Sequence, residues 1–436
     1  MKLSELEDKK ILIVGKGVEG QASFAYLSRH FPSQKITIVD QKDGASYLEN
    51  QGDYDIAIKS PGVHPDKIKI PYTTSTNIFF ANARGKIIGI TGTKGKSTTT
   101  SLIFEMLLKQ GLKAHLGGNI GVSVLEFLDE LEDDSWSVLE LSSFQLADIK
   151  YSPHIAVLLM IAPEHLDYHG DLYNYVDAKR NILKFQTQND FAIVNHDYIA
   201  SNESDVYTDA LINKISREQE VFQGCYIKDD KIYLKMHGDA ESILDISEVK
   251  LKGKHNLENI CSSIVAALCA GATMKSVIPV IKTFSGLEHR LEYVAEKKGV
   301  IYYNDSLATI PEATIEAIEA LGEVETLIAG GHDRGINFDA LGSYLSTSTL
   351  KNLILFPTTG EKIWEALCNA LPNENLRPKK HIVTTMEEAV RIASENTTNG
   401  KICLMSPAAS SFNLFKDYKD RGEQFKKAVN NLQFSS

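Results

Sequence analysis

The chain has 436 residues, of which 43% are hydrophobic and 24% are charged, and this length predicts two or three domains. The formal net charge of -11 argues against a nucleic-acid partner, because phosphate contacts require a basic surface. Five cysteines without a CxxC or zinc-like spacing indicate reduced thiols in a cytoplasmic protein. We find no secretion signal and no apolar run long enough to span a bilayer, so no membrane partner is expected.

The first part of the chain alternates short β-branched segments with a helical one, which is typical of an α/β fold with parallel sheets. We expect a helix over 19–31 and strands over 10–15, 35–40 and 54–62. The first strand leads into Gly15-Lys16-Gly17-Val18-Glu19-Gly20, a G-x-G-x-x-G turn, and Asp40 ends the next strand. This pattern is the dinucleotide-binding fingerprint with an acid for a ribose hydroxyl. Alone, it favours a nicotinamide or flavin oxidoreductase.

A second glycine loop follows a strand and opens a helix within residues 85–111. It reads ITGTKGKSTTT over 90–100, and a helix N-terminus offers free N–H groups to phosphate. Lys96 would reach the β- and γ-phosphates of ATP, and the Ser97 hydroxyl would ligate Mg²⁺. The loop is a Walker variant, because Ile90 stands where the first glycine is usual. Since hydride chemistry needs no separate triphosphate loop, the first fingerprint becomes ambiguous.

The remaining elements extend the α/β pattern. Buried strands ending in polar residues are expected over 135–146 and 153–165, and a helix over 254–272. Residues 225–236 alternate like a hairpin across Asp229-Asp230. A third unit has strands expected over 300–305, 325–331, 352–357 and 401–407. We predict a Rossmann-like N-terminal domain, a central P-loop domain with a mostly parallel sheet and a Rossmann-like C-terminal domain, over 1–85, 86–286 and 287–436.

The T-G-T-x-G-K-S form of the second loop resembles the Mur ligases, the ATP-dependent amino-acid-adding enzymes of peptidoglycan synthesis. Further matching motifs occur in order along the chain: GGNIG (117–121), LELSSFQL (139–146), EHLDYHG (164–170), YVDAKRNIL (175–183), GKHNLENI (253–260), GLEHRLEYV (286–294), NDSLAT (304–309), AGGHDRG (329–335) and SPAASSFNLFKDYKDRG (406–422). The resemblance implies a cytoplasmic, monomeric ligase that adds glutamate, D-glutamate in the first instance, to UDP-N-acetylmuramoyl-L-alanine through an acyl phosphate made from ATP.

Phosphoryl transfer is catalysed mainly by positioning and by cations, so such a site needs metal. Glu140, at the end of a buried strand, is a hard oxygen ligand suited to Mg²⁺. The resemblance implies two Mg²⁺ sites and a carbamylated Lys179, which requires some neutral amine and hence a desolvated lysine. From spacing alone, Lys179 would be a surface lysine and His165 a structural histidine. The implied metal ligands are Ser97, Glu140, His165 and Lys179, and the implied catalytic residues are Lys96, Glu140, His165 and Lys179.

The resemblance also assigns substrate contacts. For ATP they are Gly92, Thr93, Lys94, Gly95, Lys96, Ser97, Thr98, Asn256, Asn259, Arg290 and Asp305. For the uridine nucleotide substrate they are Gly17, Val18, Glu19, Asp40, Gln41, Lys42, Asn119, Ser142 and His165. For glutamate they are Thr309, Arg334, Ser411, Phe412 and Tyr418.

Two departures leave alternatives open. The usual family form N-D-S-K-A-T-N reads NDSLATI here, with Leu307 and Ile310 in place of Lys and Asn. A related loop occurs in ligases that add L-glutamate, so the same reaction with L-glutamate is the alternative. More distant alternatives are a catalytically silent Mur-like binding protein and, from the first fingerprint alone, an NAD-dependent oxidoreductase.

Overall fold

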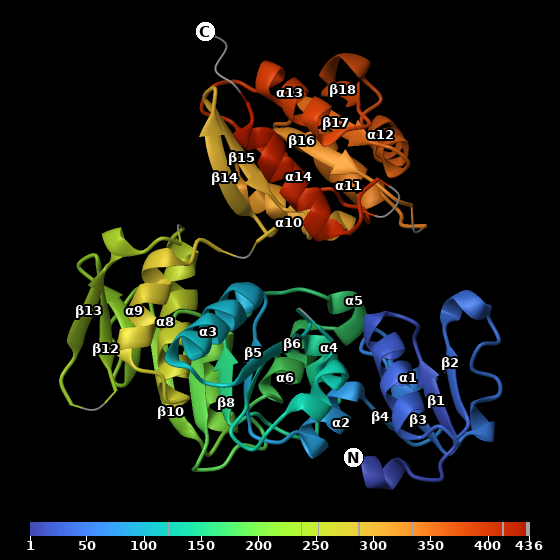
Figure 1. Ribbon diagram of the computed structural model, residues 1–436, viewed down its shortest axis with the longest axis vertical. Coiled ribbons are helices and arrows are strands. Elements are labelled where there is room, and N and C mark those ends of the chain that lie inside the picture. The colour runs from blue at the N-terminus through green and yellow to red at the C-terminus, as the bar shows by residue number, and fades with distance from the viewer. Residues whose placement is uncertain are drawn as a thin grey trace. The chain divides into compact units, whose positions relative to one another are not determined.

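The computed structural model describes residues 1–120, 122–236, 238–251, 253–286, 288–333, 335–411 and 414–432. The chain forms two compact units, Met1–Phe284 and Ser285–Ser436 (Figure 1). The first unit contains a four-stranded and a nine-stranded sheet, and the second contains a six-stranded sheet. The predicted α/β class is confirmed. The predicted boundary at residue 85 stays a prediction, because Met1–Phe284 forms one compact unit.

The four-stranded sheet has the order β2-β1-β3-β4 and is entirely parallel. Its elements are β1 (Ile11–Val14), α1 (Val18–His30), β2 (Ile36–Val39), β3 (Ile56–Lys59), β4 (Tyr72–Thr73) and α2 (Ser75–Asn82). The turn between β1 and α1 requires glycine at two positions. Gly15 has φ +108°, and a Cβ on Gly20 would lie 1.8 Å from the Gly15 carbonyl oxygen. The first fingerprint therefore forms the tight strand-to-helix turn that it predicts.

The nine-stranded sheet has the order β13-β12-β11-β10-β9-β8-β5-β7-β6. It is parallel from β6 to β11, while β12 and β13 run antiparallel to their neighbours. Its strands are β5 (Lys86–Thr91), β6 (Ala114–Gly118), β7 (Trp136–Glu140), β8 (Ile155–Leu158), β9 (Phe191–Asn195), β10 (Leu211–Ser216), β11 (Gly224–Lys228), β12 (Lys231–Lys235) and β13 (Glu241–Asp245). The predicted hairpin is confirmed, with Asp229 and Asp230 in the left-handed region between β11 and β12.

The helices of this part are α3 (Lys96–Gln110), α4 (Ser143–Leu146), α5 (Leu166–His169), α6 (Leu172–Arg180), α7 (Ile199–Asn202), α8 (Lys254–Cys269) and α9 (Met274–Thr283). Helices α3 and α8 pack against each other, and α8 also contacts β8 to β11. The strand expected over 135–146 instead ends at Glu140. Ser142 and Gln145 form a capping box there and start helix α4, because Ser-x-x-Gln satisfies the free N–H groups of a helix N-terminus.

The six-stranded sheet of the second unit has the order β14-β15-β19-β16-β17-β18, and all its pairs are parallel except β14 with β15. Its strands are β14 (Glu292–Lys297), β15 (Val300–Asn304), β16 (Val324–Gly330), β17 (Asn352–Phe356), β18 (Lys379–Ile382) and β19 (Ile402–Met405). Its helices are α10 (Pro311–Leu321), α11 (Asp339–Thr347), α12 (Thr359–Ala370), α13 (Met386–Asn396) and α14 (Tyr418–Asn430).

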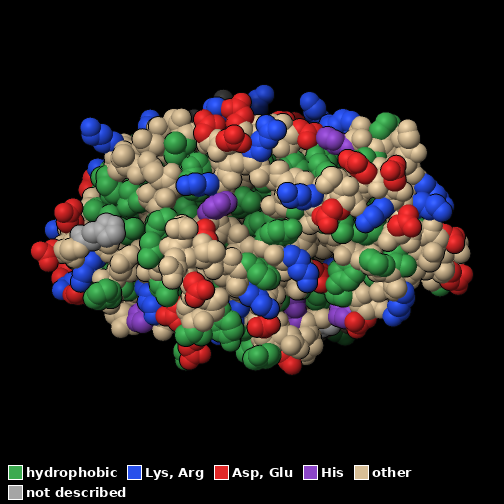
Figure 2. All heavy atoms as spheres, turned by 90° about the horizontal axis from the view of Figure 1, so that it is seen from below, with side chains coloured by type: hydrophobic (Ala, Val, Ile, Leu, Met, Phe, Trp, Pro, Cys, Tyr) green, Lys and Arg blue, Asp and Glu red, His purple; other side chains and the backbone are tan. Residues whose placement is uncertain are grey.

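The surface carries charged and hydrophobic side chains side by side, as the composition suggests. On the face shown in Figure 2, acidic, basic and hydrophobic side chains are interspersed. Among the described residues, no helix combines the length and the apolar character that crossing a bilayer requires.

Candidate active site

The phosphate loop lies between β5 and α3. Gly92 has φ +154° and Gly95 has φ +88°, conformations that favour glycine. The Lys96 ammonium donates to the carbonyl oxygens of Gly92 at 3.1 Å and Thr93 at 2.9 Å. Its charge therefore lies over the loop that would receive the phosphates.

A carboxylate and a hydroxyl meet beside this loop. Strand β7 pairs with β5, so Glu140 at the end of β7 lies at the same sheet edge as the loop. The Ser97 Oγ donates to Glu140 Oε2 at 2.6 Å, and the Asn119 Nδ2 donates to Glu140 Oε1 at 2.9 Å. Glu140 is buried, with 2% of its surface exposed.

This pair fits magnesium by its donor chemistry. Hydroxyl and carboxylate oxygens are hard ligands, and Mg²⁺ on nucleotides combines one or two such groups with phosphate oxygens. Within the described part of the chain, no group of three His, Cys, Asp or Glu side chains is arranged to hold a metal ion on its own. A magnesium site here would therefore be completed by the nucleotide.

Lys179 is buried beside the same loop. Only 2% of it is exposed, its Nζ donates to the Gly92 carbonyl at 2.8 Å, and Nζ lies 4.7 Å from the centroid of the Tyr175 ring. Burial and the nearby Lys96 ammonium lower the Lys179 pKa to about 7, against the opposing effect of Glu164 and Glu140. A large share of the amine is therefore neutral near neutral pH, whereas spacing alone suggested a solvated lysine.

His165 caps the short helix α5 and neighbours Tyr175. Its backbone is left-handed, with φ +54°, and its side chain is 45% exposed. The Tyr175 ring centroid lies 6.4 Å from the His165 ring centroid, so His165 and Lys179 both neighbour this ring. The Tyr175 hydroxyl is fixed by the Thr93 hydroxyl at 2.9 Å. The structure thus gathers His165 and Lys179 around one aromatic ring.

Two asparagines of α8 reach the phosphate loop. A Cβ on Gly95 would lie 2.2 Å from Asn259 Oδ1, so the loop backbone touches this amide. The Asn259 Nδ2 donates to Asn256 Oδ1 at 2.9 Å, which orders the pair. Both predicted ATP contacts of α8 are therefore next to the predicted phosphate site.

The residues assigned to the uridine nucleotide are distributed around the first sheet. Asp40 accepts from the backbone N–H groups of Lys16 at 2.8 Å and Lys42 at 3.1 Å, and these bonds lower its pKa. Val18 is 79% exposed beside Gly17. Glu19 turns inward instead, where its carboxylate accepts from Ser75 and Gln145. The structure does not gather Asp40 and Glu19 into one contact.

In the second unit, Asp305 lies at the end of β15 and is buried. Its carboxylate accepts from the Leu291 N–H at 3.1 Å and the Ser406 hydroxyl at 2.7 Å. Arg290 is exposed and lies between two residues with left-handed backbone, His289 at φ +63° and Leu291 at φ +45°. Asp305 thus anchors the segment that presents Arg290.

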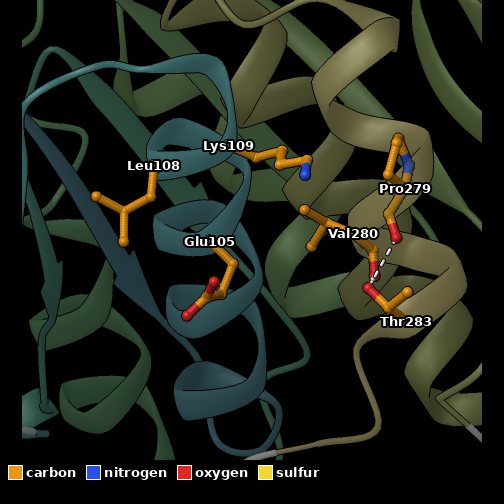
Figure 3. A pocket seen from close by; sticks show the side chains of 6 residues that line it. All are labelled: Glu105, Leu108, Lys109, Pro279, Val280 and Thr283. Carbon is orange, nitrogen blue, oxygen red and sulfur yellow. Dashed lines mark hydrogen bonds between the residues drawn. The ribbon is translucent and has the colours of Figure 1, made fainter.

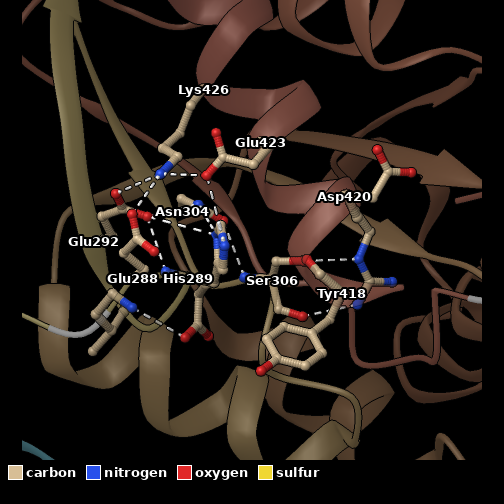
Figure 4. A network of polar contacts seen from close by, with 12 residues as sticks. Glu288, His289, Glu292, Asn304, Ser306, Tyr418, Asp420, Glu423 and Lys426 are labelled. Atoms are coloured by element: carbon tan, nitrogen blue, oxygen red, sulfur yellow. Dashed lines mark hydrogen bonds and ion pairs between the residues drawn. The ribbon is translucent and has the colours of Figure 1, made fainter. Parts of the chain in front are cut away.

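The residues assigned to glutamate are only partly described. Tyr418 starts α14, and its carbonyl accepts from the Ser306 hydroxyl at 2.7 Å (Figure 4). Ser411 is buried and Thr309 half-buried. Arg334 and Phe412 lie outside the described residues, so their places stay predictions.

A shallow pocket on α3 lies apart from these residues. It is formed by α3 and α9 (Figure 3), and its lining residues are Glu105, Leu108, Lys109, Pro279, Val280 and Thr283. Because the phosphate loop opens the first turn of α3 and this lining belongs to its later turns, we assign the pocket no part in the site.

The chain is similar to proteins of a known family. Residues 90–267 match the Mur ligase middle domain, and residues 289–409 match the Mur ligase glutamate ligase domain. A UDP-N-acetylmuramoylalanine–D-glutamate ligase of Clostridium kluyveri (strain ATCC 8527) is 37% identical over 90% of this chain and 86% of its own. An enzyme of the same name from Thermoanaerobacter sp. (strain X514) is 35% identical over 98% of this chain and 100% of its own. The chain belongs to the Mur ligase family.

Solved Mur ligases show the same fold. MurF from Acinetobacter baumannii is 17% identical, with a TM-score of 0.55 over 86% of this chain and 85% of that chain. MurF from Thermotoga maritima, solved in complex with ADP, is 18% identical, with a TM-score of 0.52 over 96% of this chain and 94% of that chain. The family consists of ATP-dependent amide ligases, and this chain is an enzyme of that class. The oxidoreductase interpretation of the first fingerprint is therefore wrong.

Sequence reasoning missed several residues that hold this Mur ligase site together. Glu258 of α8 accepts from Asn195 Nδ2 at 2.8 Å and the Tyr198 hydroxyl at 3.2 Å, and it pairs with Arg217 at 3.3 Å. Its place between the two motif asparagines is the signal that could have found it.

The second unit contains another missed network (Figure 4). The Asn304 side chain bridges His289 Nδ1 and Glu292 Oε2, each at 2.9 Å. The Lys426 ammonium pairs with Glu292 at 3.2 Å and with Glu423 at 2.6 Å. The sequence shows His289-Arg290 between two glutamates, but the partner Lys426 lies more than a hundred residues later.

Proposed function

We propose that this ligase joins glutamate to UDP-N-acetylmuramoyl-L-alanine and converts ATP to ADP and phosphate. The observation that carries the proposal is the convergence of Lys96, the Ser97–Glu140 pair and the buried Lys179 on the turn around Gly92. Relatives 32% to 37% identical over most of the chain bear the name of this reaction. We propose that the enzyme acts as a monomer in the cytoplasm, with domains over 1–85, 86–286 and 287–436.

Amide formation from a carboxylate needs a better leaving group than oxide. In the proposed reaction, a carboxylate oxygen of the alanyl group bonds to the γ-phosphorus of ATP, and ADP leaves. The glutamate amine then attacks the acyl carbon and loses a proton, and the tetrahedral intermediate releases phosphate. Lys96 and the first turn of α3 would hold the phosphates in line and stabilise the charge on the transferring group.

The same residues account for the metal requirement. Ser97 and Glu140 would hold one Mg²⁺, and His165 with a carbamylated Lys179 would hold a second. When bound, Mg²⁺ supplies positive charge to the phosphate oxygens. Carbamylation joins the neutral lysine amine to CO₂ and releases a proton, which replaces a cation by an anionic oxygen ligand. The low pKa of Lys179 supports this step because it makes the neutral amine available.

D-glutamate is the proposed substrate, since the relatives named above carry that isomer in their names. L-glutamate stays the second candidate on one observation. Leu307, which replaces the usual lysine, lies in the turn between Asp305 and α10, and its N–H donates to the His289 carbonyl at 2.9 Å. An apolar side chain therefore stands in the segment that also carries Thr309.

One experiment tests the reaction and the stereochemistry together. The chain is incubated with UDP-N-acetylmuramoyl-L-alanine, ATP and Mg²⁺, and with D- or L-glutamate in separate reactions, and product and released phosphate are counted. We expect product and stoichiometric phosphate with D-glutamate. Product with L-glutamate alone would reverse the stereochemical assignment. Absence of glutamate-dependent phosphate release with both isomers would overturn the proposed reaction.

A further inference from the structure

The second residue of α1 is an acid at a place where acid is unexpected. Glu19 follows directly on the glycine turn to which the resemblance assigns the uridine nucleotide, and a carboxylate facing a phosphate group there would repel it. Its side chain turns away from the turn instead. Oε2 accepts from the Ser75 hydroxyl of α2 at 2.8 Å, and Oε1 accepts from the Gln145 side-chain N–H of α4. Both oxygens are therefore occupied inside the protein.

Gln145 connects Glu19 to the segment that follows strand β7. Its Oε1 accepts from the Ser142 N–H at 2.9 Å and from the Ser142 hydroxyl at 3.1 Å. The next residue, Ser143, contacts His169 Nε2 of α5 through its hydroxyl at 3.0 Å. An unbroken polar connection thus runs from the α1 turn to the α4–α5 segment, which carries Ser142 and His165.

The connection is partly buried, with Gln145 and Ser143 each 2% exposed and Glu19 half-buried, and its charge is balanced nearby. Lys59 of β3, with no exposed surface, pairs with Asp148 at 2.8 Å, and its positive charge also acts on Glu19. Burial raises the pKa of Glu19, while the bonds from Ser75 and Gln145 and the charge of Lys59 oppose that rise. A half-buried acceptor held by two donors is costly to rearrange, so the carboxylate links α1 to α2 and α4.

We propose that Glu19 is a positioning residue that fixes the distance between the α1 turn and the α4–α5 segment, and that the α1 turn receives the UDP part of the substrate and the α4–α5 segment receives its muramoyl end. The proposal rests on the proposed function, because it needs a ligand that touches both ends. UDP alone touches the first end only. Loss of Glu19 should therefore weaken the complete substrate and spare UDP.

Calorimetric titration of the full chain with UDP and with UDP-N-acetylmuramoyl-L-alanine tests this inference. For Glu19→Ala we expect about tenfold weaker binding of the complete substrate and UDP binding within about twofold of wild type. Glu19→Gln should restore the complete substrate to within about threefold, because an amide can accept from Gln145 and donate to the Ser75 oxygen. Glu7→Gln, an exposed acid of the same part of the chain, is the matched control and should leave both affinities unchanged.

The titrations distinguish a failure of the positioning role from a failure of the proposed function. Equal weakening of both ligands, or weakening of neither, would overturn the positioning role, as would a Gln variant as weak as the Ala variant. If Glu19→Ala does not fold, Ser75→Ala removes one arm of the link and should show the same selective loss at about threefold; no selectivity there overturns the proposal as well. Wild-type protein that binds UDP but not the complete substrate would instead contradict the proposed function.

Discussion

At the scale of single residues, burial determines whether a lysine side chain can react near neutral pH. Lys179 and Lys184 stand five positions apart in the same charged stretch. The structure exposes Lys184 and buries Lys179 against a backbone carbonyl and an aromatic ring. Burial lowers the pKa of Lys179 to about 7. A lysine with this pKa is a base and a nucleophile near neutrality, which an exposed lysine is not.

The first prediction concerns the carbamate of Lys179. Because burial lowers the Lys179 pKa from 10.5 to about 7, the fraction of neutral amine increases as pH rises through about 7 and becomes small below it. At constant dissolved ¹³CO₂, a carbamate signal in the ¹³C NMR spectrum should rise with half its final intensity near that pH. Lys179→Ala should lack the signal. A signal that first appears near the pKa of an ordinary lysine would contradict the burial argument.

Lys96 gives a second prediction. Lys96→Ala removes the ammonium that donates to the carbonyl oxygens of both Gly92 and Thr93. Transition-state charge on the transferring phosphoryl group would lose its partner, so turnover should fall by at least about a thousandfold. ADP formation in the presence of both other substrates measures it. Lys109→Ala, in the last turn of the same helix, should keep full activity; retained activity in Lys96→Ala would remove the phosphate-loop assignment.

At the scale of elements, helix α8 has two polar faces with different partners. Asn259 contacts the phosphate loop and bonds to Asn256, while Glu258 is held by Asn195, Tyr198 and Arg217 from β9 and the segments after β9 and β10. Glu258 is buried, and burial raises its pKa. The glutamate therefore orients the first turns of α8, and with them the two asparagines.

From this arrangement we predict the effect of Glu258→Ala. Removing the carboxylate frees α8 from three donors, so the KM for ATP should rise about five- to tenfold while kcat changes less than about threefold. Glu258→Gln should recover most of the affinity, because its oxygen can still accept from Asn195. Glu248→Ala, which breaks the exposed pair with Lys282, serves as control. A loss confined to kcat would show that Glu258 does not act through ATP binding.

Elements were more predictable than the orientation of side chains. Alternating strands, the two glycine turns and the Asp229-Asp230 hairpin follow local rules of periodicity and turn chemistry, and they were expected at the right places. The strand expected over 153–165 was too long, because β8 ends at Leu158. Helix α4 was missed because the apolar run hid the Ser142–Gln145 capping box. The inward turn of Glu19 and the burial of Lys179 depend on partners more than fifty residues away, which a local pattern does not encode.

At the scale of the whole molecule, the residues assigned to ATP come from both compact units of the chain. The phosphate loop belongs to Met1–Phe284, whereas Arg290 and Asp305 belong to Ser285–Ser436. Each unit has its own buried clusters of hydrophobic side chains. Because the clusters are separate, each unit can lose its structure without the other.

Arg421 tests this independence. It is 1% exposed, and its guanidinium donates to the Ser306 hydroxyl at 3.0 Å, the Ser306 carbonyl at 2.9 Å and the Ala409 carbonyl at 3.0 Å. Arg421→Met would leave buried acceptors unpaired, at a cost of about 2–4 kcal/mol. In calorimetry we expect two unfolding transitions, and Arg421→Met should lower the temperature of the one that belongs to Ser285–Ser436. UDP should raise the temperature of the other transition, which belongs to Met1–Phe284.

Arg391→Met, which removes an exposed pair with Glu395, is the control and should shift neither transition by more than about 1 °C. A single transition that moves as a whole in Arg421→Met would mean that the two units unfold together.

The close approach of Gly95 to Asn259 has a consequence for natural variation. With only 2.2 Å between the place of a Cβ on residue 95 and the Asn259 oxygen, alanine at 95 collides with this amide unless residue 259 moves or is shortened. A shorter residue at 259 with glycine kept at 95 meets no collision, but it loses the amide assigned to ATP. Replacement of Gly95 therefore depends on a change at 259, whereas replacement of Asn259 does not depend on a change at 95.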